Sequence, residues 1–185
     1  MTQRRRPFVL DPPRPGVDQV DGILLLDVDG VLNRLGGTAD RGHLPTVEVD
    51  GSQRIPMDMI DDQVVDELDR CLGQTARVGW LTTWGFRVAR LESLLGGRLA
   101  GGFVVSERPS GVTVSDQWKY DAASRLRAAW PDARFAWAED ESIPPPLRRG
   151  TGSSLWADDL LVVPRSETGL TLDDARRITA HLRLR

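Results

Sequence analysis

Two aspartates separated by a single residue follow a short apolar run near the start of the chain. Asp27 and Asp29 lie in the segment 26–33, which reads LDVDGVLN. Residues i and i+2 of an extended strand share a face, so both carboxylates can act on one ligand. One can attack phosphorus as a carboxylate, while its neighbour protonates the leaving oxygen and later deprotonates water. Gly30 lets the backbone turn sharply and leave room for a ligand.

More polar residues follow two later apolar runs. Thr82 and Thr83 end the run 77–81, and the acids Glu139, Asp140 and Glu141 end the run 134–138. Ligands of open α/β sheets bind at the carboxyl ends of the strands, so we expect these side chains to meet Asp27 and Asp29. Such a group of acids is costly unless a cation neutralises it, and an all-oxygen site suits a hard ion. The sequence therefore predicts Mg²⁺ as a cofactor.

A lysine near the start of a predicted helix belongs to the same set. Lys119 is the single lysine among 24 basic residues, and all the others are arginine. A chain that uses arginine elsewhere has no evident reason to use lysine once, unless the site needs a compact ammonium group. Chance is the alternative explanation.

The periodicity of apolar residues predicts the elements that position these groups. Short runs buried on both faces alternate with helical patterns, which indicates an α/β fold with right-handed crossovers. We expect a Rossmann-like three-layer sandwich with a mostly parallel five-stranded sheet and a small β-hairpin flap, formed around 46–55. Strands are expected at 22–26, 77–81, 103–105, 134–138 and 159–163, and helices at 60–72, 86–95, 118–130 and 171–182.

Composition limits the class of protein. The 185 residues, 40% hydrophobic and 28% charged, suit one folded domain, here 22–185, preceded by a flexible arm at 1–21 that is rich in arginine and proline. No apolar run reaches the roughly 18 residues of a membrane span, so no membrane partner is expected. The net charge of −3 gives no general field for nucleic acid. Cys71 is the single cysteine, so it has no disulfide partner within the chain, and we expect a cytoplasmic location.

The motifs resemble those of the haloacid dehalogenase superfamily, whose signature is an apolar strand followed by Asp-x-Asp-Gly-(Thr/Val). The later motifs of that family look like Thr82 after a strand, the helix-borne Lys119, and the acids Glu139 and Asp140. The resemblance implies a phosphatase that hydrolyses phosphomonoesters through an aspartyl-phosphate. It implies that Asp27 is the nucleophile and that Asp29 is the general acid/base. It implies that the phosphorylated substrate is bound by Thr82, Thr83, Lys119 and Gly30. It also implies that Mg²⁺ is bound by Asp27, by the Asp29 carbonyl and by Glu139 or Asp140.

The resemblance also bears on the substrate. The stretches 34–58 and 84–118 are too short to hold the cap domains of the family, so the site is expected to be open to bulky substrates. The segments 80–84, 137–141 and 169–171 are weakly similar to small capless members associated with RNA-repair proteins. A polynucleotide end, a nucleotide or a phosphoprotein are then candidate substrates, and a small metabolite would need a lid from a partner subunit in an oligomer. The alternative is a non-catalytic module of the same fold that binds phosphate, metal or protein.

Each candidate residue also has a plain structural interpretation. An aspartate after a strand is often a turn or cap residue, Lys119 could be a solvated helix residue, and Glu139–Glu141 an exposed acidic turn. Their joint occurrence in the order of the family favours a site. The tryptophans that flank the motifs could stack on a base, although core packing is the more common role of such residues; they are Trp80, Trp84, Trp118 and Trp137.

Overall fold

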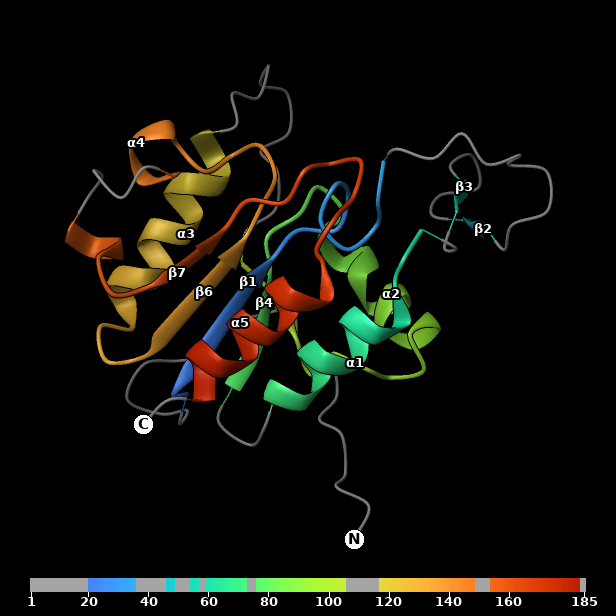
Figure 1. Cartoon of the computed structure of the whole chain (residues 1–185), viewed down its shortest axis with the longest axis horizontal. Coiled ribbons are helices and arrows are strands. Elements are labelled where there is room, and N and C mark those ends of the chain that lie inside the picture. Colours follow the sequence, from blue (N-terminus) through green and yellow to red (C-terminus); the bar gives the residue numbers. More distant parts are fainter. Residues whose placement is uncertain are drawn as a thin grey trace, which may run out of the picture.

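A five-stranded parallel sheet forms the centre of the protein (Figure 1). The strand order is β5-β4-β1-β6-β7. The computed structural model describes residues 20–35, 46–48, 54–56, 59–72, 76–105, 117–148 and 154–183. The strands are β1 Gly22–Leu26, β4 Ala76–Trp80, β5 Phe103–Val104, β6 Arg134–Ala138 and β7 Leu160–Val162. The predicted α/β, Rossmann-like fold is thus confirmed, and no large cap domain occurs in the described part of the chain.

The central strand β1 is covered on both faces, as the burial of all five of its residues shows. Leu24 and Leu26 belong to one apolar cluster, and Ile23 and Leu25 belong to the other. Side chains of a strand alternate between its faces, so an unbroken apolar run supplies both layers. The register then fixes the edge of the sheet: Leu26 pairs with Trp80 of β4 and with Ala138 of β6.

The helices complete three layers. The first cluster takes in α1 (Asp62–Cys71), α2 (Val88–Leu94) and α5 (Leu172–Arg183), while the second takes in α3 (Gln117–Ala129). Helices α1 and α5 lie side by side on one face, and α3 covers the other (Figure 1). Asp61 caps α1 through the Gln63 N–H. Cys71 is on the buried side of α1, and burial raises the pKa of its thiol to about 11.

The structure adds details that the periodicity did not predict. A 3₁₀ turn, η2 (Gly85–Arg87), precedes α2, and two short helices, α4 (Pro145–Arg148) and η3 (Ser154–Trp156), lie in the segment between β6 and β7. The predicted hairpin exists as antiparallel β2 (Thr46–Glu48) and β3 (Arg54–Pro56), although its turn falls outside the described residues.

The start of the described chain already belongs to the folded domain. Of the predicted arm at 1–21, only the last two residues are described. Val20 is buried, and the Asp21 carbonyl accepts a hydrogen bond from the Arg134 N–H. Among the described residues, no helix combines the length and apolarity that crossing a membrane requires.

Candidate active site at the carboxyl edge of the sheet

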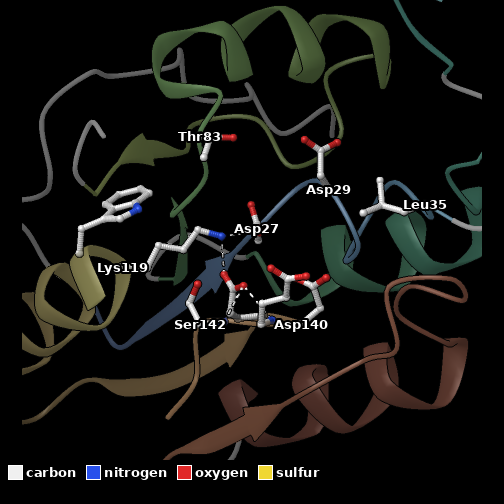
Figure 2. Close-up of a pocket in the computed structure, with 10 residues that line it drawn as sticks. Asp27, Asp29, Leu35, Thr83, Lys119, Asp140 and Ser142 are labelled. Atoms are coloured by element: carbon white, nitrogen blue, oxygen red, sulfur yellow. Dashed lines mark hydrogen bonds and ion pairs between the residues drawn. The ribbon is translucent and has the colours of Figure 1, made fainter. Parts of the chain in front are cut away.

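The predicted residues come together where β1, β4 and β6 end (Figure 2). Asp27 directly follows β1 and Glu139 directly follows β6, so the paired register of Leu26 with Ala138 places the two carboxylates next to each other. Lys119, in the first turn of α3, reaches them from the helical layer. The convergence predicted from sequence is therefore found in the structure.

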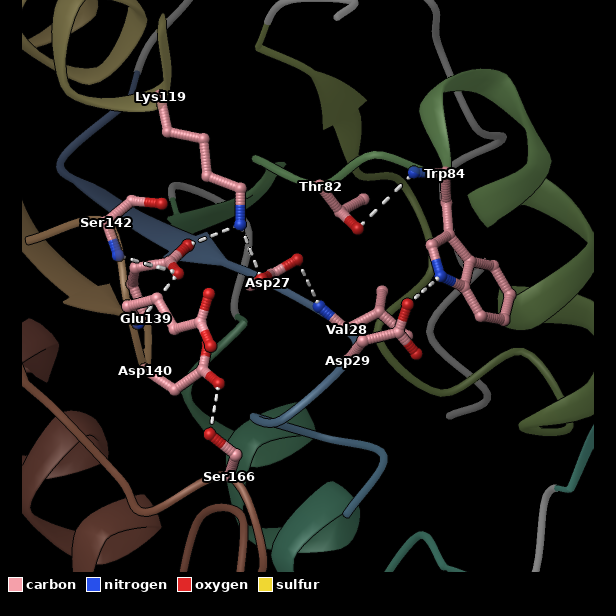
Figure 3. Close-up of polar contacts among 11 residues, drawn as sticks. Asp27, Val28, Asp29, Thr82, Trp84, Lys119, Glu139, Asp140, Ser142 and Ser166 are labelled. Carbon is pink, nitrogen blue, oxygen red and sulfur yellow. Dashed lines mark hydrogen bonds and ion pairs between the residues drawn. The ribbon is translucent and has the colours of Figure 1, made fainter. Parts of the chain in front are cut away.

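Lys119 bridges two buried carboxylates. Its Nζ donates to Asp27 Oδ2 at 2.6 Å and to Glu139 Oε2 at 2.7 Å (Figure 3). The exposed fractions are 7% for Lys119, 5% for Asp27 and 0% for Glu139, so solvent screens these ion pairs far less than surface pairs. This geometry excludes the plain interpretation of Lys119 as a solvated helix residue.

Burial and charge change the acidity of all three groups. Burial raises the pKa of Asp27, and Lys119 only partly opposes that change. Burial, followed by the nearby Asp27 charge, raises the pKa of Glu139 to about 7, again against the influence of Lys119. Burial alone would lower the pKa of Lys119, but the two carboxylates more than offset it and the pKa is raised. One ammonium therefore does not fully neutralise the two carboxylates.

Backbone N–H groups also donate to the carboxylates of Asp27 and Glu139. Asp27 Oδ1 accepts from the Val28 N–H at 2.7 Å. Glu139 Oε1 accepts from the N–H groups of Glu141 at 3.2 Å and Ser142 at 3.1 Å. Glu139 thus receives three hydrogen bonds in all, one of them from Lys119, and its orientation is set by the turn that follows β6.

The Asp140 side chain lies against the turn that follows β1. Its Oδ2 accepts from the Ser166 hydroxyl at 2.6 Å, which ties it to the segment after β7. Gly30 adopts φ +76°, and a Cβ there would lie 2.1 Å from Asp140 Oδ2. The sharp turn predicted at Gly30 is present, but the space beside it is taken by the Asp140 carboxylate. A role for Gly30 in substrate binding stays a prediction.

Three carboxylates could hold a metal ion together. Asp27, Glu139 and Asp140 each offer an oxygen, and these oxygens lie within 4.8 Å of one another. A donor set made of carboxylate oxygens fits a hard divalent cation such as Mg²⁺. Asp29, which was predicted to bind Mg²⁺ through its backbone carbonyl, contributes no carboxylate oxygen to this group, and that carbonyl stays a prediction.

The Asp29 carboxylate turns away from Lys119 and towards Trp84 (Figure 3). Its Oδ2 accepts from the Trp84 indole Nε1–H at 2.8 Å, and its Oδ1 accepts from Asn33 Nδ2 at 3.4 Å. Asp27 and Asp29 therefore share one strand end but have different partners, which suits two different roles.

The two threonines differ in their surroundings. Thr82 is 1% exposed; its hydroxyl accepts from the Trp84 N–H, and it lies near enough to Asp27 to lower the pKa of that carboxyl slightly against the effect of burial. Thr83 is exposed and faces the pocket (Figure 2). The residues that line this pocket are Asp27, Asp29, Leu35, Thr83, Trp118, Lys119, Glu139, Asp140, Glu141 and Ser142.

Sequence reasoning missed several of these residues. Leu35 is 54% exposed and Ser166 lies far along the chain, so neither belongs to a recognisable motif. Among the flanking tryptophans, Trp80, Trp84 and Trp137 are buried, as expected of core residues, whereas the half-buried Trp118 lines the pocket. Trp118 was named from the sequence as a residue that could stack on a base, and that role stays a prediction.

Comparison with known proteins adds no relative. No protein-family model, no curated protein and no solved structure matches the chain.

Proposed function

We propose that the protein is a magnesium-dependent phosphatase that hydrolyses phosphomonoesters through a phosphoryl group carried on Asp27. The observation that carries this proposal is the Lys119 bridge between Asp27 and Glu139, beside Asp140, at the carboxyl edge of the sheet. A buried carboxylate that is held in place and paired with a single ammonium suits nucleophilic attack on phosphorus. The resemblance of the motifs to haloacid dehalogenase phosphatases supports the same reaction.

The proposed reaction has two steps. In the first, an oxygen of Asp27 forms a bond to phosphorus, the bond from phosphorus to the leaving oxygen breaks, and that oxygen takes a proton from Asp29. In the second, a water molecule gives a proton to Asp29 and attacks the phosphorus, which releases inorganic phosphate and restores the Asp27 carboxylate. General acid and base help of this kind typically accelerates a step by roughly 10²–10⁴ fold.

The remaining polar residues balance charge. Lys119 contacts Asp27, Thr82 lies near it, and both would also bind phosphoryl oxygens. We assign Mg²⁺ to Asp27, Asp140 and the Asp29 carbonyl, since Glu139 already accepts three hydrogen bonds and serves to hold Lys119. When bound, Mg²⁺ supplies positive charge that neutralises the phosphoryl oxygens.

The lining of the pocket supports a leaving group of some size. Leu35 and Trp118 line the pocket together with polar residues. Bulky phosphomonoesters, including nucleotides and polynucleotide ends, are therefore the substrates that we propose first.

Release of phosphate from an aryl and an alkyl phosphomonoester, with Mg²⁺ or with EDTA, tests the proposal. We expect magnesium-dependent release by the wild type and none by Asp27→Asn, which is nearly isosteric but a poor nucleophile. Asp121→Asn, an exposed change on α3, is the matched control and should keep full activity. A wild type that binds Mg²⁺ and phosphate but releases none from any ester would instead indicate a binding module.

A further inference from the structure

The indole of Trp84 contacts the second aspartate of the first motif. Its Nε1–H donates to Asp29 Oδ2 at 2.8 Å, and the two residues are 55 positions apart in sequence. Trp84 is 5% exposed and Asp29 is only partly buried, so this contact joins the buried core to the pocket. An indole nitrogen is a donor only, and a hydrogen bond to a charged acceptor is among the stronger kinds.

The turn after β4 carries this indole. The Trp84 N–H donates to the Thr82 hydroxyl, and the Gly85 N–H donates to the Thr82 carbonyl. Gly85 adopts φ +54°, a conformation that favours glycine. Thr82, which lies near Asp27, thus also contacts the residue that contacts Asp29.

Asn33 holds the other oxygen of Asp29 more loosely. Its Nδ2 lies 3.4 Å from Asp29 Oδ1, which is long for a hydrogen bond. Asn33 is 4% exposed, and its Oδ1 has no hydrogen-bond partner among the described residues. A half-turn of this amide would exchange its donor for its acceptor, so one side chain can serve both the carboxylate and the carboxylic acid.

We infer that Trp84 and Asn33 are positioning residues for Asp29: Trp84 holds Oδ2 and Asn33 holds Oδ1 only loosely, so Oδ1 is the oxygen that exchanges a proton with the substrate. The indole N–H occupies Oδ2 and cannot accept a proton, so the hydrogen of the acid form belongs on Oδ1. The acid gives this hydrogen to the leaving oxygen, and the resulting carboxylate takes one back from water at the same atom. This inference rests on the proposed phosphatase function.

The leaving group provides the kinetic test. Trp84→Phe keeps an aromatic ring but removes the indole N–H donor, so the Asp29 carboxyl is no longer held in one orientation. We expect kcat for an alkyl phosphate to fall about 10-fold or more, and kcat for an activated aryl phosphate to fall much less, because the aryl oxygen needs little protonation. KM should change little for either ester. In an Asp29→Asn background, Trp84→Phe should cause no further loss, since there is no acid left to aim.

Trp80 offers a matched control. Its indole also donates to a buried carboxylate, that of Glu92, at 2.9 Å, and it is 0% exposed. Trp80→Phe therefore removes the same kind of contact from the core beside the same strand. It should lower the unfolding temperature but leave the ratio of alkyl to aryl kcat as in the wild type.

A spectroscopic measurement tests the contact without turnover. In ¹H–¹⁵N spectra, Trp84→Phe assigns the indole resonance, and Asp29→Asn should shift that resonance by more than any other indole signal. An unshifted resonance, or an active Trp84→Phe enzyme with the wild-type alkyl-to-aryl ratio, would overturn the inference while the phosphatase function stands. A wild type that hydrolyses no ester would overturn the function and the positioning role together, even with the shift present.

Discussion

Replacing Glu139 by glutamine should make the stability of the metal-free protein less dependent on pH. Glu139 is fully buried beside Asp27, and its pKa is raised to about 7 from an ordinary value of 4.5. The folded state therefore retains a proton on Glu139 over a pH range in which the unfolded chain has released it. The stability that this proton supports is fully present below pH 4.5 and is lost as pH rises through 7.

The size of the effect follows from the two pKa values. A carboxyl whose pKa moves from 4.5 to about 7 loses about 3 kcal/mol of unfolding free energy across that interval. Glutamine does not titrate, so the variant escapes this loss. The glutamine also places an amide donor next to other donors, either Lys119 or the N–H groups of Glu141 and Ser142. This lowers the unfolding free energy of the variant by the same amount at every pH.

Urea unfolding in EDTA at pH 4, 6 and 8 measures the difference in unfolding free energy between Glu139→Gln and the wild type. We expect this difference to move in favour of the variant by about 3 kcal/mol between the lowest and highest pH. Glu92→Gln is the control, because burial also raises the pKa of Glu92, which lies among Trp80 and Gly102 rather than near the metal candidates. Replacing EDTA by Mg²⁺ should reduce the pH-dependent change in this unfolding free-energy difference for Glu139→Gln but not for Glu92→Gln. A difference for Glu139 that stays constant with pH would refute the reasoning.

Three further predictions follow from the same geometry. Lys119→Arg should lose nearly as much activity as Lys119→Ala, because a planar guanidinium does not fit between carboxylates 2.6 and 2.7 Å away; wild-type kcat in the arginine variant would contradict this. Asp29→Asn should slow phosphorylation by an alkyl phosphate by roughly 10²–10⁴ fold, but should still give a burst of phenol from an aryl phosphate in rapid-quench experiments; equal slowing without a burst would argue against a proton shuttle. Gly30→Ala should lower the unfolding free energy by about 1–3 kcal/mol and weaken Mg²⁺ binding in calorimetry, because φ is +76° and the new Cβ would displace Asp140; unchanged values of both would show that the turn adapts.

The sheet could be predicted because each buried strand leaves an unbroken apolar run. The run at β1 gave its bounds directly, and the polar residues after β1, β4 and β6 indicated one edge of the sheet. The start of a helix can be predicted where a capping residue stands. Thr171 directly precedes α5, and its hydroxyl forms hydrogen bonds with Asp174 in the first turn of the helix. The short helices α4 and η3 were missed because a single turn has no periodicity to detect.

The partners of the site residues could not be read from the sequence. The sequence placed Lys119 at the site by its rarity, but the split between Glu139, which pairs with Lys119, and Asp140, which pairs with Ser166, depends on the turn after β6. The bond from Trp84 to Asp29 likewise depends on how two loops meet. Such contacts arise from tertiary packing, for which local spacing carries no signal.

Detection of a phosphoryl group on Asp27 tests the central claim most directly. The protein is mixed with an aryl phosphate and Mg²⁺, quenched within milliseconds, digested and examined by mass spectrometry. We predict that the peptide containing Asp27 gains the mass of one phosphoryl group, that Asp29→Asn accumulates more of this species than the wild type, and that Asp27→Asn forms none. Turnover with no phosphorylated peptide in either the wild type or Asp29→Asn would contradict the account.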